Sequence, residues 1–107
     1  MSLENIVWQG GLLDCYGALL TDRQRECLDL YYNENLSLGE IAGHFHISRQ
    51  AVHDAMRHGE EQLAAYEAAL HMEASRAARK EAAEALARLI PPERAAEAEK
   101  LLRILCE

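Results

Sequence analysis

Four polar side chains share one face of a predicted helix, because their positions differ by one, four and eight residues from the first: Arg49, Gln50, His53 and Arg57. A guanidinium and a carboxamide each offer two hydrogen-bonding groups, which match the major-groove edges of guanine and adenine. Ser48 precedes this face, and its hydroxyl and the amides of a helix N-terminus can meet a phosphate. The five residues form a candidate DNA-binding site. The alternative is a solvated face on a module that binds protein.

Two predicted helices, near 38–45 and 49–70, position this face. Ser37 and Glu40 have the spacing of a capping box for the first helix, and Ser48 can cap the second. Apolar residues recur where two helices that cross about a tight turn must meet: Ile41, Phe45, Ile47, Val52 and Ala55. The segment therefore predicts a helix-turn-helix.

Three further residues near the turn carry specific expectations. Ala42 is small where the second helix crosses closest, so the helices can approach each other. His46 occupies the turn, and histidine is among the residues that tolerate a positive φ. Asp54 lies three residues before Arg57 and four before His58, so we expect an ion pair within the helix.

Every other segment of the chain also reads as helix or loop, and the predicted fold class is all-α. A helix over 3–16 is expected to bend or start late at Gly10-Gly11, because glycine disfavours helix. The remaining expected elements are a helix from Thr21 with Gln24 completing its capping box, a loop at 33–35, a break near 71–75, a helix over 76–90, a stop at Pro91-Pro92 and a last amphipathic helix over 92–106.

The apolar residues of the first helices predict how they pack. A stripe suited to a core consists of Leu3, Ile6, Val7, Leu13 and Tyr16, with Leu12, Cys15 and Leu19 beside it. A second stripe consists of Cys27, Leu28, Tyr31 and Tyr32. We expect Cys15 and Cys27 to be core thiols and Cys106 to be the exposed one. The aromatic residues Trp8, Tyr16, Tyr31 and Tyr32 are expected to build the junction of the first two helices.

The sequence suggests two parts, a helix-turn-helix domain over 1–70 and a long C-terminal helical hairpin or extension over 71–107. Alanine supplies 11 of the 30 residues between 61 and 90, and alanine is the strongest helix former. This stretch is either a solvated helix or a surface on which two long helices approach closely. The close approach would occur in a hairpin with 92–106 or across a dimer, and we expect a homodimer.

The charge of the chain opposes a general affinity for DNA. The net charge is −7, and residues 21–60 contain four arginines against seven acidic residues. DNA repels such a protein at long range, because non-specific affinity comes mostly from lysine and arginine neutralising phosphates. DNA binding would therefore depend on a thin local positive face.

Several function classes find no support in the residues. The three cysteines form no CxxC pattern, which favours a reducing cytoplasm, and no apolar run approaches the roughly 20 residues of a membrane span. His44, His46, His53 and His58 lack the cysteine or acidic residue that would complete a zinc set at a recognised spacing. We expect no catalytic residues, no metal, no cofactor and no enzymatic activity.

The amino-acid sequence between residues 12 and 70 resembles that of the YlxM-type helix-turn-helix proteins of bacteria. The resemblance rests on LTDRQRE at 20–26, LYY at 30–32, LSLGEIA at 36–42 and ISRQAV at 47–52. His53 stands where that family usually has tyrosine. The segment is more distantly similar to region 4 of bacterial sigma factors, which binds promoter DNA and touches RNA polymerase.

This resemblance implies a DNA-binding regulatory protein with a link to the signal recognition particle, the protein-targeting pathway. The alternative is an adaptor that binds RNA polymerase or signal recognition particle components rather than DNA. The acidic composition and the helical extension favour the adaptor, whereas the sequence of the motif favours DNA binding.

Overall fold

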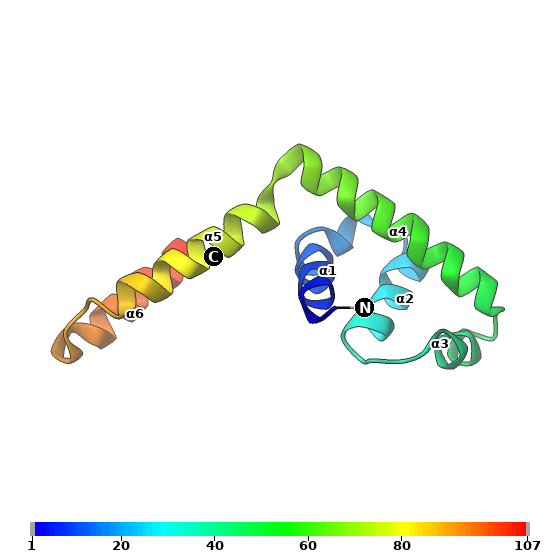
Figure 1. Ribbon diagram of the computed structural model, residues 1–107, viewed down its shortest axis with the longest axis horizontal. Coiled ribbons are helices and arrows are strands. Elements are labelled where there is room, and N and C mark those ends of the chain that lie inside the picture. Colours follow the sequence, from blue (N-terminus) through cyan, green and yellow to red (C-terminus); the bar gives the residue numbers. More distant parts are fainter. Residues whose placement is uncertain (1, 107) are drawn as a thin grey trace. The chain divides into compact units, whose positions relative to one another are not determined.

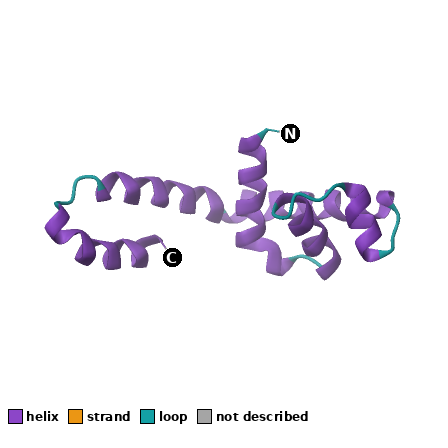
Figure 2. Ribbon diagram, turned by 90° about the horizontal axis from the view of Figure 1, so that it is seen from below, coloured by secondary structure: helices purple, strands orange, loops and turns teal. Residues whose placement is uncertain are grey.

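The computed structural model describes residues 2–106, and this range contains six α-helices and two short 3-10 turns with no strand (Figures 1 and 2). The all-α prediction is confirmed. The chain separates into two compact units between Leu70 and His71. The elements are α1 (Leu3–Tyr16), η1 (Gly17–Leu19), α2 (Asp22–Tyr32), α3 (Leu38–Phe45), α4 (Arg49–Leu70), α5 (Met72–Ala87), η2 (Pro92–Arg94) and α6 (Ala95–Cys106).

The first unit is organised around α4, on which α1, α2 and α3 all pack (Figure 1). The largest side chains that are fully buried come from all four helices: Tyr16, Leu28, Ile41, Leu63, Val52 and Cys27. The predicted stripe on α1 is partly wrong. Leu12 belongs to the core, whereas Leu3 and Val7 are 76% and 66% exposed. The face of α1 that meets α2 and α4 is centred near its C-terminal half, so Leu3 and Val7 in its first turns stay exposed.

Side-chain caps fix where α2 and α3 begin, as the sequence predicts. Thr21 Oγ1 accepts from the Gln24 amide at 3.2 Å, and the Gln24 side chain accepts from the Thr21 amide at 3.2 Å. Ser37 and Glu40 form the same reciprocal pair at 3.1 Å in each direction. The expected bend at Gly10-Gly11 is absent, because α1 runs unbroken from Leu3 to Tyr16. Burial of Gly11 and its leucine neighbours offsets the weak helix propensity of glycine.

α2 packs closely against α4 at Gly59. A Cβ atom at Gly59 would lie 2.8 Å from Leu28 Cδ1 and 3.4 Å from Gln24 Cβ. Such a distance to Leu28 is too short for two carbon atoms, so a side chain here would displace Leu28 from its buried position.

The hydroxyl groups of two tyrosines join α1 and α2 to α4, a role that the predicted aromatic junction of the first two helices does not include. The Tyr16 hydroxyl donates to Glu67 Oε1 at 2.7 Å in a buried contact. The Tyr32 hydroxyl donates to Glu60 Oε1 at 2.6 Å. Trp8 is 39% exposed. Buried hydroxyl groups need partners, and the acidic residues on the inner side of α4 supply them.

The second unit consists of α5 and α6, which pack against each other as a hairpin. The break before α5 is narrower than predicted, because the single residue His71, with φ 52°, separates α4 from α5. The helix predicted over 76–90 therefore starts at Met72 and ends at Ala87. Pro92 opens a 3-10 turn, and α6 proper starts at Ala95 rather than at 92.

Candidate nucleic-acid interface

The predicted helix-turn-helix is present as α3, a three-residue turn and α4. His46 has φ 58° and ψ 43°, so it adopts the left-handed conformation that the sequence allows for it. The Ile47 amide donates to the Ala42 carbonyl at 3.0 Å and closes the end of α3. Ser48 Oγ accepts from the Ala51 amide at 3.0 Å, which confirms its capping role. The turn therefore fixes where the first residues of α4 lie.

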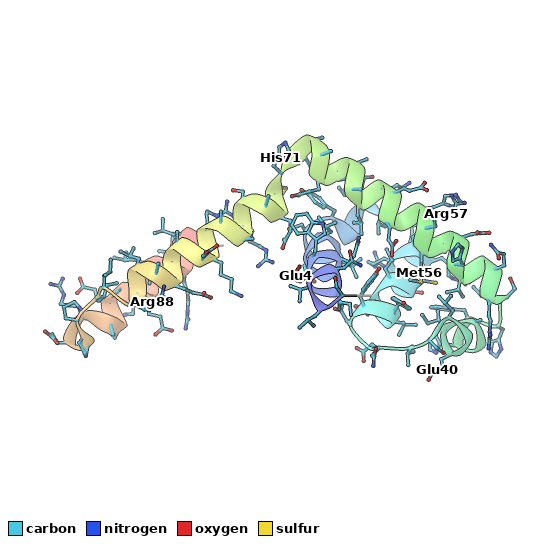
Figure 3. The ribbon with its side chains drawn as sticks, viewed as in Figure 1. Glu4, Glu40, Met56, Arg57, His71 and Arg88 are labelled. Carbon is cyan, nitrogen blue, oxygen red and sulfur yellow. The ribbon has the colours of Figure 1, made fainter. Side chains whose placement is uncertain are left out.

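The inner side of α4 is held by the core. Ile41 and Val52 have no exposed surface, and Met56 is 7% exposed. In Figure 3, Met56 lies on the side of α4 that faces α2, and Arg57 lies on the other side. Because α4 is fixed on its apolar side, its outer side chains stand on a rigid support. All five candidate residues are exposed: Ser48, Arg49, Gln50, His53 and Arg57.

Arg49 is the cation on this face without an acidic partner among the described residues. Its guanidinium lies beside the first turn of α3, because a Cβ atom at Gly39 would be 2.8 Å from Arg49 Nη2 and 3.1 Å from Nε. Gly39 leaves room for this position. Arg49 is therefore exposed, has no acidic partner among the described residues and lies at the junction of α3 and α4.

The other three side chains of the face interact with acidic residues of α4. Gln50 Nε2 donates to Asp54 Oδ1 at 2.9 Å, and His53 Nδ1 lies 3.7 Å from the same carboxylate oxygen. Arg57 pairs instead with Glu61 at 3.3 Å, and its second amino group lies 3.4 Å from His58 Nε2.

The predicted pair between Asp54 and Arg57 is therefore wrong. Glu61, one helical turn after Arg57, is the carboxylate that pairs with its guanidinium, and Asp54 turns to Gln50 on the preceding turn. In both pairs the acidic residue follows its partner by four positions.

Arg23, on α2, is a further exposed cation and lies beside the helix-turn-helix. Its guanidinium carbon lies 4.5 Å from the centre of the Phe45 ring at the end of α3. A cation over an aromatic face is attracted to the ring and keeps its charge. Arg23 and Arg49 thus lie near opposite ends of α3. Only the packing of α2 against α3 brings Arg23 here, so spacing along the sequence could not reveal it.

A groove of about 370 Å³ adjoins the candidate face. His53 and Arg57 line it from α4, Tyr31 and Tyr32 line it from α2, and Gln9 lines it from α1. Burial and the hydrogen bond to the Glu60 carboxylate raise the pKa of Tyr32 well above its usual value, so this hydroxyl stays protonated. Within residues 2–106 no three metal-binding side chains come together, although four histidines surround the motif.

Comparisons with known proteins agree with this architecture. The sequence profile of the UPF0122 family, described as "Putative helix-turn-helix protein, YlxM / p13 like", matches residues 3–102. The chain belongs to the UPF0122 family. This membership confirms the resemblance found in the sequence and extends it over most of the chain.

Three relatives show how far the similarity reaches. A UPF0122 protein of Lacticaseibacillus casei is 45% identical over 86 residues, which cover 80% of this chain and 76% of that protein. One of Limosilactobacillus reuteri is 41% identical over 90 residues, covering 84% and 80%. One of Clostridium kluyveri is 54% identical over 61 residues, covering 57% and 55%. No helix within residues 2–106 is long and apolar enough to cross a membrane.

Proposed function

We propose that this UPF0122 protein is a DNA-binding regulator that contacts the major groove with the N-terminal turns of α4. The observation that carries the proposal is the exposed position of Arg49, uncompensated by acid, on a helix whose other side is buried in the core. A guanidinium in this position can pair with guanine. The role is one of binding rather than catalysis.

The contacts of the face suggest how each side chain would act. Arg49 and Gln50 stand on the first turn of α4, and the first residues of a recognition helix reach the base edges. Gln50 would exchange its hydrogen bond with Asp54 for one with adenine. Arg57, two turns further along, would leave Glu61 for a phosphate. Because two of these contacts replace internal ones, we expect modest affinity. Because few phosphates are neutralised, we expect a shallow dependence of affinity on salt.

The distribution of charge favours a second candidate function, that of a protein adaptor. Residues 1–70 contain 11 acidic residues and four arginines, a net charge of −7, whereas residues 71–107 contain seven of each. The entire net charge of the chain thus lies in the helix-turn-helix unit. An acidic module of this kind suits a basic protein partner. Resemblance points to RNA polymerase or a component of the signal recognition particle as that partner.

Genomic DNA selection combined with a protein pull-down from the same bacterial lysate separates the two functions. The test variant is Arg49→Ala/Gln50→Ala. The matched control is Arg79→Ala/Gln62→Ala, which removes one arginine and one glutamine at exposed positions away from the face. We expect wild type and control to enrich the same DNA and the test variant to enrich none. Enrichment of proteins alone, equal for all three forms, would support the adaptor and contradict DNA binding.

A further inference from the structure

The hairpin of α5 and α6 leaves much of its apolar surface uncovered. On α6, residues spaced four apart are half-buried: Ala98, Leu102 and Cys106. A second set of apolar side chains, which we call the outer face of α6, consists of Leu101, Ile104 and Leu105, exposed by 59%, 69% and 62%. Large apolar side chains gathered on one surface mark an interaction site.

The outer face is offset around the helix from the half-buried set. With 3.6 residues per turn, the centres of the two sets lie about 100° apart. One neighbouring helix covers only one such stripe, so the apolar arc of α6 is wide enough for two. Leu89, which follows α5 in the same hairpin, is 80% exposed. The composition of α6 is therefore that of a helix in a bundle rather than of a helix in a hairpin alone.

We propose that a second copy of this chain covers the outer face of α6, so that two hairpins form an intermolecular four-helix bundle. The second unit spans only residues 71–107, and two helices of this length cannot enclose a core. No apolar residue between 71 and 106 is fully buried. Two hairpins would place four helices around a common apolar centre, an arrangement that symmetric dimers use.

The charges of the hairpin favour a second copy over a charged partner. With seven acidic and seven basic residues, residues 71–107 have no net charge to repel an identical unit. Three of the arginines already pair within their own helices, Arg76 with Glu73 at 2.7 Å, Arg94 with Glu97 at 3.0 Å and Arg103 with Glu99 at 2.7 Å. Association through residues 1–70 would instead bring two charges of −7 together.

The proposed dimer also bears on the proposed function. Only its consequence for DNA binding rests on that function. A dimer would carry two copies of α4 and could read two half-sites related by a two-fold axis. The oligomeric state is measured without DNA. Failure of DNA binding and failure of dimerisation are therefore distinguishable.

The first experiment is sedimentation of the full chain over a range from about 1 to 100 μM. Each chain has a mass of 12.0 kDa, and we expect wild type to reach twice that mass. Leu101→Glu/Ile104→Glu should remain a single chain over the whole range. Leu3→Glu/Val7→Glu is the matched control, because these residues are equally apolar and exposed on α1, and it should dimerise like wild type.

The second experiment locates the contact without a substitution. Both lysines of the chain, Lys80 and Lys100, lie in the hairpin. A mixture of isotopically light and heavy protein treated with an amine cross-linker should yield peptides that join a lysine of one copy to a lysine of the other. A single-chain mass for wild type at every concentration would overturn the proposal. So would a double-glutamate variant that still dimerises, or the absence of cross-links between light and heavy copies.

Discussion

The two units of this UPF0122 protein are both helical, but they differ in how far their apolar side chains are buried and in their net charge. The first unit encloses a core, in which Cys27, Ile41 and Val52 are fully inaccessible, and it carries the entire net charge of −7. The second unit leaves Leu101, Ile104 and Leu105 exposed and is electrically neutral. The buried core of the first unit thus forms a rigid frame, whereas the exposed apolar surface of the second unit is available to a partner.

Under the two proposals, the first unit would serve recognition and the second unit would serve assembly. The frame of the first unit holds an exposed polar face that needs no second chain to form. The hairpin has exposed apolar surface and no net charge, which suits association of two identical hairpins.

The largest contrast concerns leucine. Leu28→Ala should lower the free energy of unfolding of the first unit by about 2–5 kcal/mol, because the leucine is 1% exposed in a closed core. Leu101→Ala should change the free energy of unfolding of the first unit by less than about 0.5 kcal/mol. Denaturant unfolding followed by the fluorescence of Trp8, the single tryptophan, reports the first unit. If both substitutions lowered this free energy equally, the distinction between the closed core of the first unit and the exposed surface of the second would be contradicted.

The next contrast concerns alkaline pH, because all four tyrosines lie in the first unit. Burial and the hydrogen bond to Glu60 raise the pKa of Tyr32 above its usual value of 10.0, so the folded state keeps a proton that the unfolded state loses. The stability contributed by Tyr32 is thus complete below about pH 10 and declines as the pH rises above it.

Tyr32→Phe tests this contribution. The variant should be less stable at neutral pH by about 1.5 kcal/mol, since a hydrogen bond to a carboxylate is lost. Above pH 10 its free energy of unfolding should decline less steeply than that of wild type. Parallel declines for the two proteins, measured by Trp8 fluorescence, would show that Tyr32 does not carry the effect.

A smaller effect is expected from the acidic residues that pair with arginines. Glu61→Gln releases Arg57 and removes one negative charge near the face, so DNA affinity should rise about two- to fivefold at 0.1 M salt, with a steeper salt dependence. Glu97→Gln is the control in the second unit, where Glu97 pairs with Arg94 at 3.0 Å in an equally exposed contact. An equal rise for both variants would assign the effect to net charge alone.

The smallest contrast lies within α3. Gly39→Ala and Gly43→Ala should each stabilise the helix by up to about 1 kcal/mol, because alanine has the better helix propensity. A Cβ at Gly39 would displace the Arg49 guanidinium, whereas a Cβ at Gly43 meets nothing within 4 Å. DNA affinity should therefore fall severalfold for Gly39→Ala only. A titration in which both variants bind like wild type would show that the position of Arg49 is unimportant.

Local signals in the sequence predict most of the fold. The capping residues Thr21, Ser37 and Ser48 mark the helix starts, because each cap depends on residues three positions away. The left-handed conformation of His46 likewise follows from its place in the turn. Elements near residue 71 are less well predicted, because one residue with positive φ ends α4 without any glycine or proline to mark it.

The contacts of the candidate face are harder to predict than its members. Spacing identifies the exposed set Arg49, Gln50, His53 and Arg57, but several carboxylates lie within reach of the same side chain. Whether Arg57 pairs with Asp54 or Glu61 depends on rotamers rather than on periodicity. The approach of Arg49 to Gly39 and that of Arg23 to Phe45 depend on tertiary packing.

The most direct measurement is the affinity of the full chain for its selected DNA, with Arg49→Ala compared to wild type by fluorescence anisotropy. Loss of a guanidinium that pairs with a base should weaken binding at least about tenfold. Arg79→Ala, at an exposed position on α5, should bind within about twofold of wild type. Unchanged affinity for Arg49→Ala, or equal losses for both variants, would contradict the proposal that the N-terminal face of α4 reads DNA.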